Sequence, residues 1–154
     1  MPAVSDHNRR FRRLQISRND FKRAIEFIAA AIGHDADSIE HEALLIAAVI
    51  CYARPFSPNE KPPTKANAKL PKEFARFDDA EDRKLHMQVI KLRNKAVAHS
   101  EFRFHRVKVV GHTATSRQWR VSREGMDLFR FDRIAKQMET RCGFEVYAAV
   151  VHRD

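Results

Sequence analysis

The chain lacks several features that would place it in common functional classes. No run of apolar residues is long enough to span a bilayer, and the first residues, MPAVSDHNRRFRRLQ, include no apolar segment typical of a secretory signal. Cysteine is scarce, because only Cys51 and Cys142 are present, each in an apolar helical context and without metal-ligand spacing. We therefore expect a cytoplasmic protein with no membrane partner and with two reduced thiols in its core.

Glycine is also scarce, and its four positions are isolated from one another: Gly33, Gly111, Gly125 and Gly143. The chain consequently has no glycine-rich phosphate-binding loop and no Gly-x-Ser-x-Gly motif of a serine nucleophile. Its eight histidines have neither the i, i+4 spacing of a helical metal site nor paired cysteines beside them. The sequence predicts no metal and no cofactor.

Basic residues are abundant. Twenty-nine Lys and Arg stand against twenty Asp and Glu, which gives a net charge of +9 in 154 residues. An apolar fraction of 44% with eleven Phe indicates one globular domain over residues 1–154. A basic domain favours polyanionic partners, most often nucleic acid, although basic surfaces also serve solubility.

Residues 1–16 form a basic N-terminal arm in this interpretation. Phe11 could stack on a base while the surrounding arginines bind phosphates, or the arm could be a solvated, frayed terminus. The arginines are Arg9, Arg10, Arg12 and Arg13. Ser17 and Asp20 resemble a capping box, so we expect a helix to begin there and to end at Gly33. Its predicted apolar stripe comprises Phe21, Ile25, Ile28 and Ile32.

A second helix is expected from a cap at Asp37 or Ser38 to just before Pro55, because the residue preceding a proline is disfavoured in a helix. It is apolar nearly all round and should be the most buried helix. A Pro-rich loop follows over residues 55–77, since five of the six prolines lie between Pro55 and Pro71. Lys72–Phe77 is expected to form a short helical turn within it.

The longest periodic segment is Glu81–Glu101, which we expect to be the central helix. Asp78 and Asp79 precede it, and acids are favoured at a helix N-terminus. One apolar stripe is predicted to face the core, and a second stripe is rotated by about 100° from the first. The first comprises Leu85, Val89, Leu92 and Ala96, and the second His86, Ile90, Arg93 and Val97.

After the central helix the period changes. Phe102, Phe104, Val107 and Val109 suggest one strand, and Gln118–Ser122 a second strand. Gly111–Ser116 is rich in turn residues, so we expect an inserted β-hairpin at about 102–122. Its many basic residues suit RNA contact, or they form a solvated strand face. A last helix is expected from about Met126, although Val146–Val151 could instead be a terminal strand. Its stripe comprises Phe131, Ile134, Met138, Cys142, Val146 and Val150.

At the end of the central helix, an arginine and a polar residue are followed by a histidine a few residues later: Arg93-Asn94-Lys95-Ala96-Val97-Ala98-His99. In this region, Leu92–Glu101 (LRNKAVAHSE), the chain resembles the HEPN superfamily, helical bundles of prokaryotic toxin and defence systems that often act as ribonucleases. The Leu85–His86 pair and the segment Tyr52–Ser57 (YARPFS) support the resemblance. It implies an all-α fold, a HEPN-like four-helix bundle with the hairpin inserted.

The resemblance also implies a function, a metal-independent endoribonuclease that works as a toxin or defence effector. Its catalytic residues would be Arg93, Asn94 and His99, with RNA held by Lys95, Arg54 and the arginines of the arm. An imidazole with an unperturbed pKa near ~6.5 can move the proton of the 2′-hydroxyl, and a guanidinium can stabilise charge on the phosphate. The products would end in a 2′,3′-cyclic phosphate. The alternative is a non-catalytic HEPN-like bundle that binds RNA or a partner protein.

Helix geometry limits how Arg93 and His99 can meet. Six residues correspond to about 9 Å along a helix and about 120° around it. Either Arg93 extends along the helix, or two subunits bring two motifs together. The resemblance implies the second arrangement, which is a homodimer. It also implies an antitoxin protein as a further partner. Alternatively, His99 is a buried histidine at a helix end and Arg93 pairs with an acid on a neighbouring helix.

Overall fold

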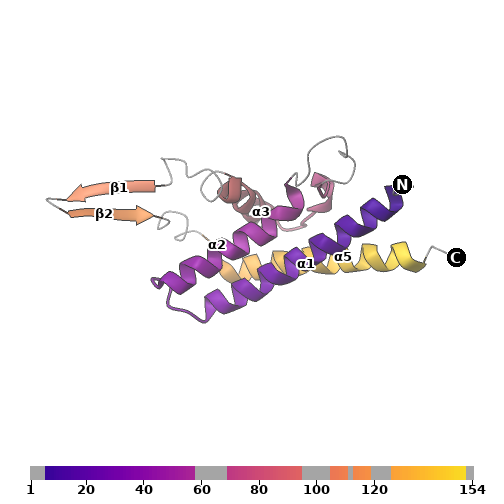
Figure 1. Ribbon diagram of the computed structural model, residues 1–154, viewed down its shortest axis with the longest axis horizontal. Coiled ribbons are helices and arrows are strands. Elements are labelled where there is room, and N and C mark those ends of the chain that lie inside the picture. Colours follow the sequence, from indigo (N-terminus) through magenta and orange to yellow (C-terminus); the bar gives the residue numbers. More distant parts are fainter. Residues whose placement is uncertain (1–5, 58–68, 95–104, 111–112, 119–125, 152–154) are drawn as a thin grey trace, which may run out of the picture.

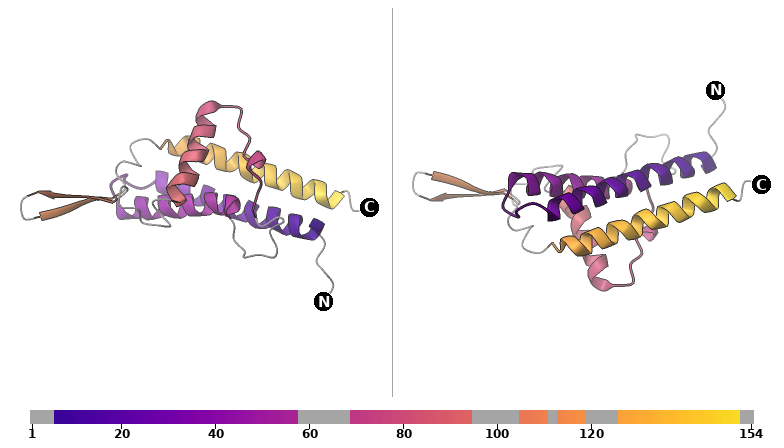
Figure 2. Two further views of the ribbon diagram at one scale, coloured as in Figure 1. Left: turned by 90° about the horizontal axis from the view of Figure 1, so that it is seen from above. Right: turned by 90° about the horizontal axis from the view of Figure 1, so that it is seen from below.

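The computed structural model describes residues 6–57, 69–94, 105–110, 113–118 and 126–151. Within them, four α-helices form a helical bundle, as predicted: α1 (Asp6–Ile32), α2 (Ile39–Ala53), α3 (Ala80–Leu92) and α5 (Leu128–Val151). Helices α1 and α5 lie side by side and run in opposite directions, α2 packs on α1, and α3 crosses the bundle (Figures 1 and 2). No helix of the described residues is long and apolar enough to cross a membrane.

Helix α1 begins eleven residues before the predicted capping box, at Asp6. Ser17 and Asp20 are therefore not at a helix start but lie buried within α1, at 0% and 6% exposure. The buried face includes Leu14, Ser17, Phe21 and Ile28, which recur at the i, i+3, i+7 and i+14 positions of one helix face. The small hydroxyl of Ser17 allows this face to continue toward the N-terminus. The prediction of a basic arm separate from the first helix was wrong for the described residues 6–16.

Helix α2 begins and ends where the sequence predicts. The Ser38 side chain accepts a hydrogen bond from the backbone N–H of His41 at 3.1 Å, and the helix ends at Ala53, two residues before Pro55. Seven of its fifteen residues are buried, a larger share than in α3 or α5. The expectation of a strongly buried second helix is confirmed.

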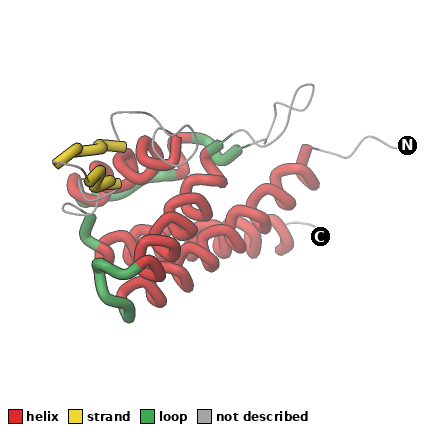
Figure 3. The backbone as a smooth tube through the Cα atoms, turned by 60° about the vertical axis from the view of Figure 1, so that its left-hand side comes forward, coloured by secondary structure: helices red, strands yellow, loops and turns green. Residues whose placement is uncertain are grey.

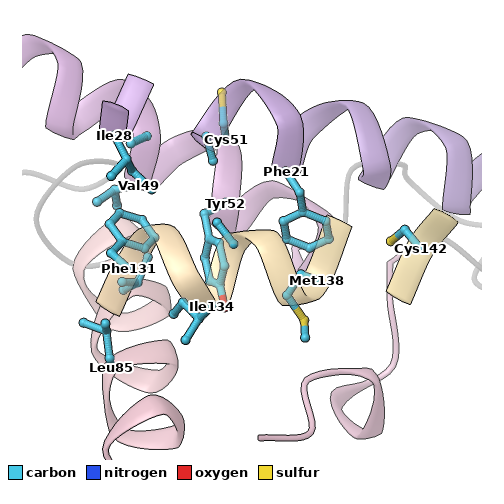
Figure 4. Close-up of a cluster of buried hydrophobic side chains, with 14 of the residues drawn as sticks. Phe21, Ile28, Val49, Cys51, Tyr52, Leu85, Phe131, Ile134, Met138 and Cys142 are labelled. Carbon is cyan, nitrogen blue, oxygen red and sulfur yellow. The ribbon is translucent and has the colours of Figure 1, made fainter. Parts of the chain in front are cut away.

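The core lies where α1, α2 and α5 meet, and α3 closes one side of it (Figure 4). Phe21, Tyr52, Phe131, Ile134 and Met138 are all completely buried. Burying one such side chain stabilises the fold by about 2 kcal/mol relative to leaving it exposed.

The remaining core predictions are also largely confirmed. Cys51 and Cys142 are free and buried. Helix α5 continues through Val151, so its last residues are helical rather than a strand, and its predicted stripe is buried as far as Val146, whereas Val150 is 52% exposed.

The ends of the Pro-rich loop are held together. The backbone N–H of Leu70 donates to the carbonyl of Pro55 at 2.7 Å. One 3₁₀ turn, η1 (Arg54–Phe56), covers the start of the loop, and a second, η2 (Lys72–Phe74), follows Pro71. The helical turn predicted at Lys72–Phe77 therefore ends three residues earlier. Residues 58–68 lie outside the described part of the chain.

Two strands, β1 (His105–Val110) and β2 (Thr113–Gln118), pair antiparallel, with Val107 opposite Ser116 and Val109 opposite Ala114. Figure 1 shows them beyond one end of the helices, and Figure 3 marks them in yellow. The predicted turn at Gly111–Ser116 was wrong for its last four residues, because Thr113–Ser116 belong to β2. Most of the predicted second strand, including Trp119 and Val121, lies outside the described residues.

Candidate functional site

The candidate site is at the C-terminal end of α3. Asp79 caps the helix, because its carboxylate accepts hydrogen bonds from the backbone N–H groups of Glu81 and Asp82 at 2.7 and 3.2 Å. These two bonds lower the pKa of Asp79. The predicted core stripe is confirmed as far as described, since Leu85, Val89 and Leu92 are buried.

Arg93 and Asn94 follow α3 directly, and their side chains meet. The guanidinium Nη1 of Arg93 donates to the amide Oδ1 of Asn94 at 3.0 Å, and both side chains are half-buried. Arg93 is the C-cap of α3 and keeps helical backbone angles, with its N–H donating to the carbonyls of Val89 and Ile90. Because the Asn94 oxygen holds one guanidinium nitrogen, the remaining N–H groups of Arg93 have a defined direction from which to bind an oxyanion.

The other residues of the motif, Lys95 and His99, lie outside the described residues. The distance from Arg93 to His99 therefore stays a prediction. The structure describes two of the three predicted catalytic residues, Arg93 and Asn94.

The two upstream segments that support the family resemblance contact each other. The Tyr52 hydroxyl lies 2.9 Å from His86 Nδ1, a hydrogen bond buried between α2 and α3. Phe56 packs edge-on against the His86 ring, with centroids 4.9 Å apart, and Phe77 lies 5.6 Å away. Residues 34 positions apart in the sequence thus form one aromatic cluster, Tyr52, Phe56, Phe77 and His86.

Burial of His86 changes its chemistry. Loss of water around the ring lowers the pKa of His86 to about 4, because an imidazolium is poorly solvated among aromatic rings. The imidazole is therefore neutral at pH 7. Burial also raises the pKa of Tyr52 well above its ordinary value, so its hydroxyl keeps its proton.

His86 also borders a pocket of about 290 Å³, which we call the α3 pocket. Its remaining apolar lining comes from η1, the segment after residue 68 and α3: Phe56, Leu70, Ala75, Met87 and Ile90. Three cationic side chains, Lys69, Lys72 and Arg83, complete it. No carboxylate is among the described residues that line it.

The four arginines predicted to bind phosphate lie on α1. Arg10 and Arg12 are exposed, and Arg9 is half-buried. Arg13 is only 7% exposed, so it belongs to the packed interior. Arg10 also pairs with Glu145 of α5 at 3.1 Å, across an exposed part of the surface. Phe11, one possible base-stacking residue, is half-buried and packs against the core.

Arg54, the other predicted RNA-binding residue, is held by a buried acid of α1. Its Nη1 donates to Asp20 Oδ1 at 2.9 Å, while its side chain remains 46% exposed. Burial raises the pKa of Asp20, and the positive charge of Arg54 opposes this rise. This pair joins α1 to the end of α2.

The position of α3 is fixed by a second ionic contact. Asp82, whose side chain is 3% exposed, accepts from Arg130 at 2.8 Å and from Arg133 at 2.6 Å. Both arginines come from the first turns of α5. The contact holds the start of α3 against α5 and so fixes the direction in which the helix presents Arg93.

No group of three or more His, Cys, Asp or Glu able to hold a metal occurs among the described residues. Comparison of the chain with protein-family models, with curated proteins and with solved structures gives no match.

Sequence reasoning missed the α3 pocket and placed His86 on a stripe for contact with a second subunit. That prediction was wrong for His86, because its ring is buried within its own subunit. The available signal was the pair of segments Leu85–His86 and Tyr52–Ser57, each of which contributes to the aromatic cluster.

Proposed function

We propose that this protein is an RNA-binding helical bundle of the HEPN type that cleaves RNA without a metal ion. Arg93 and Asn94 would bind the scissile phosphate, and His99 would transfer the proton. The observation that supports the proposal most is the Arg93–Asn94 hydrogen bond of 3.0 Å at the end of α3. It orients a guanidinium whose other N–H groups make no side-chain bond within the described part of the chain, and such groups can stabilise charge on a phosphate.

The proposed reaction is a transesterification within the RNA strand. His99 accepts the proton of a 2′-hydroxyl, and the 2′-oxygen attacks the adjacent phosphorus. The bond from phosphorus to the 5′-oxygen breaks, and the departing 5′-oxygen takes up a proton. The products are a 2′,3′-cyclic phosphate and a free 5′-hydroxyl, and Arg93 opposes the charge that grows on the phosphate oxygens in between.

Cleavage of a labelled single-stranded RNA in excess chelator tests this proposal. The purified full chain should cut RNA and leave a cyclic phosphate, whereas DNA of the same sequence should remain intact, because it has no 2′-hydroxyl. Absence of RNA cleavage, or equal cleavage of the DNA, would contradict the proposed reaction.

The alternative is a non-catalytic bundle that binds RNA or a partner protein. The exposed Arg10 and Arg12 and the cationic lining of the α3 pocket favour it, because phosphate binding by these groups needs no histidine. Binding of RNA without cleavage, unchanged on His99→Ala, would select this alternative.

We also propose, from the resemblance, that the protein is a homodimer and that an antitoxin protein is a further partner. With His86 buried, Ile90 and Arg93 are the half-buried members of the second stripe within the described residues. Light scattering at micromolar concentration should give twice the mass of the 17.9 kDa chain, and a monodisperse monomer would contradict the dimer.

A further inference from the structure

We propose that the α3 pocket binds one nucleotide of an RNA strand, with the base against its apolar wall and the phosphate at its cationic side. This inference rests on the proposed RNA-binding function and extends it, because it assigns a subsite next to the Arg93–Asn94 pair.

The apolar wall suits a nucleobase. Phe56 offers a half-buried aromatic ring, and Met87 and Ile90 add apolar side chains from α3 to the pocket lining. Met87 is 64% exposed, so the wall is open to a ligand from solvent. A volume of about 290 Å³ lies at the small end of the ligand pockets found in proteins, which favours a single nucleotide over a larger ligand. A base–aromatic contact tolerates any base, because every base has a π face.

The charged side of the pocket suits a phosphate. Lys69 and Lys72 are both exposed, and an ammonium group binds phosphate as a compact point charge. Arg83 is oriented by two backbone carbonyls, because its Nη1 donates to Phe77 at 2.6 Å and to Asp78 at 3.0 Å. With three cations and no carboxylate among its described lining residues, the pocket favours an anion over a neutral or cationic ligand.

His86 supplies one polar group at the inner wall. Its Nδ1 is fixed by Tyr52, and its Nε2, on the other side of the ring, has no hydrogen-bond partner among the described residues. The residue is 8% exposed and lines the pocket, so a ligand there can satisfy this nitrogen. A neutral imidazole fits an uncharged base edge better than an imidazolium would, and a single fixed polar group in an apolar pocket orients a ligand.

The pocket lies on the same face of α3 as the candidate catalytic pair. His86, Ile90 and Arg93 occupy the i, i+4 and i+7 positions of that helix face, and the first two line the pocket. Arg93 is about 4.5 Å farther along the helix axis than Ile90. A strand with one base in the pocket can therefore continue to Arg93 without leaving this face.

Calorimetric titration of the full chain with the four ribonucleoside 5′-monophosphates tests the pocket. At least one should bind more tightly than adenosine or inorganic phosphate alone, because the pocket contacts both base and phosphate. Met87→Glu places a carboxylate on the apolar wall and adds negative charge to a pocket proposed to bind an anion, so it should weaken that binding at least tenfold, which corresponds to about 1.4 kcal/mol. Ile39→Glu is the matched control, because Ile39 is 82% exposed, lies outside the pocket and changes the net charge equally.

The result that overturns the inference is binding of no nucleotide, binding equal to that of phosphate, or an affinity that Met87→Glu leaves unchanged. RNA cleavage by the same variants separates this result from failure of the proposed ribonuclease. Cleavage by the wild type with the same KM in Met87→Glu overturns the pocket and leaves the ribonuclease intact. Nucleotide binding that Met87→Glu abolishes, without any RNA cleavage, supports the pocket and contradicts the ribonuclease.

Discussion

The burial of His86 should make the stability of the fold depend on pH in a defined way. The pKa of His86 falls from an ordinary 6.5 to about 4 in the folded chain. Between these values the unfolded chain binds a proton that the folded chain does not, so the free energy of unfolding decreases as the pH falls. From the two pKa values, His86 alone should remove about 2 kcal/mol of stability between pH 7 and pH 5.

Urea unfolding followed by circular dichroism at pH 7, 6 and 5 measures this loss. Other groups also titrate in this range, so the comparison uses His86→Asn, whose amide oxygen lies near the position of Nδ1 and can still accept from Tyr52. The variant should lose about 2 kcal/mol less than the wild type between pH 7 and pH 5, whatever its stability at pH 7. His34→Asn, at an exposed position, is the control and should lose as much as the wild type. Equal losses in wild type and His86→Asn would refute a neutral, buried His86.

Three further predictions concern the bundle and its charges. Asp82→Asn should lower the free energy of unfolding by about 2–3 kcal/mol, because Arg130 and Arg133 lose their buried carboxylate partner. Lys84→Gln is the control, because it breaks the exposed pair with Glu81 and should change the free energy of unfolding by less than about 0.5 kcal/mol. Ser38→Ala should cost about 1 kcal/mol in the same urea assay through loss of the α2 cap, and a change near zero would contradict the capping bond. RNA affinity measured by fluorescence anisotropy should fall steeply as the salt concentration rises. Replacing Arg10 and Arg12 by Gln should make this dependence of affinity on salt less steep, for all RNA sequences alike. An unchanged salt dependence would show that these residues of α1 do not contact the RNA.

The helix starts and stripes were predictable where local chemistry determines them. The caps Ser38 and Asp79 accept hydrogen bonds from backbone N–H groups within three residues, so their capping role is visible in the sequence. The stripe of α5 was predictable as far as Val146 because its apolar residues recur with helical spacing. The start of α1 was not predictable, because a polar residue, Ser17, occupies the middle of its buried face and resembles a cap.

The candidate site was predictable only in part. Arg93 and Asn94 are adjacent in the sequence, so their closeness at the end of α3 was predictable, whereas the hydrogen bond between their side chains was not. The aromatic cluster depends on a contact between Tyr52 and His86 across 34 residues, and no local pattern reports such a contact. Leu85 of the first stripe and His86 of the second are both buried, because α3 packs against both α2 and α5. The spacing of apolar residues along α3 could not distinguish this packing within one subunit from a contact with a second subunit.

The rate of RNA cleavage by Arg93→Ala, with chelator present and at a single turnover, tests the proposed function most directly. Loss of the guanidinium should slow cleavage about 10²–10³-fold, because one preorganised donor supplies about 3 kcal/mol to a charged transition state. Lys91→Ala is the matched control, since it removes an exposed cation from the last turn of the same helix and should leave the rate within about twofold. Arg93→Ala that remains folded and cleaves RNA as fast as the wild type would contradict the assignment of the site.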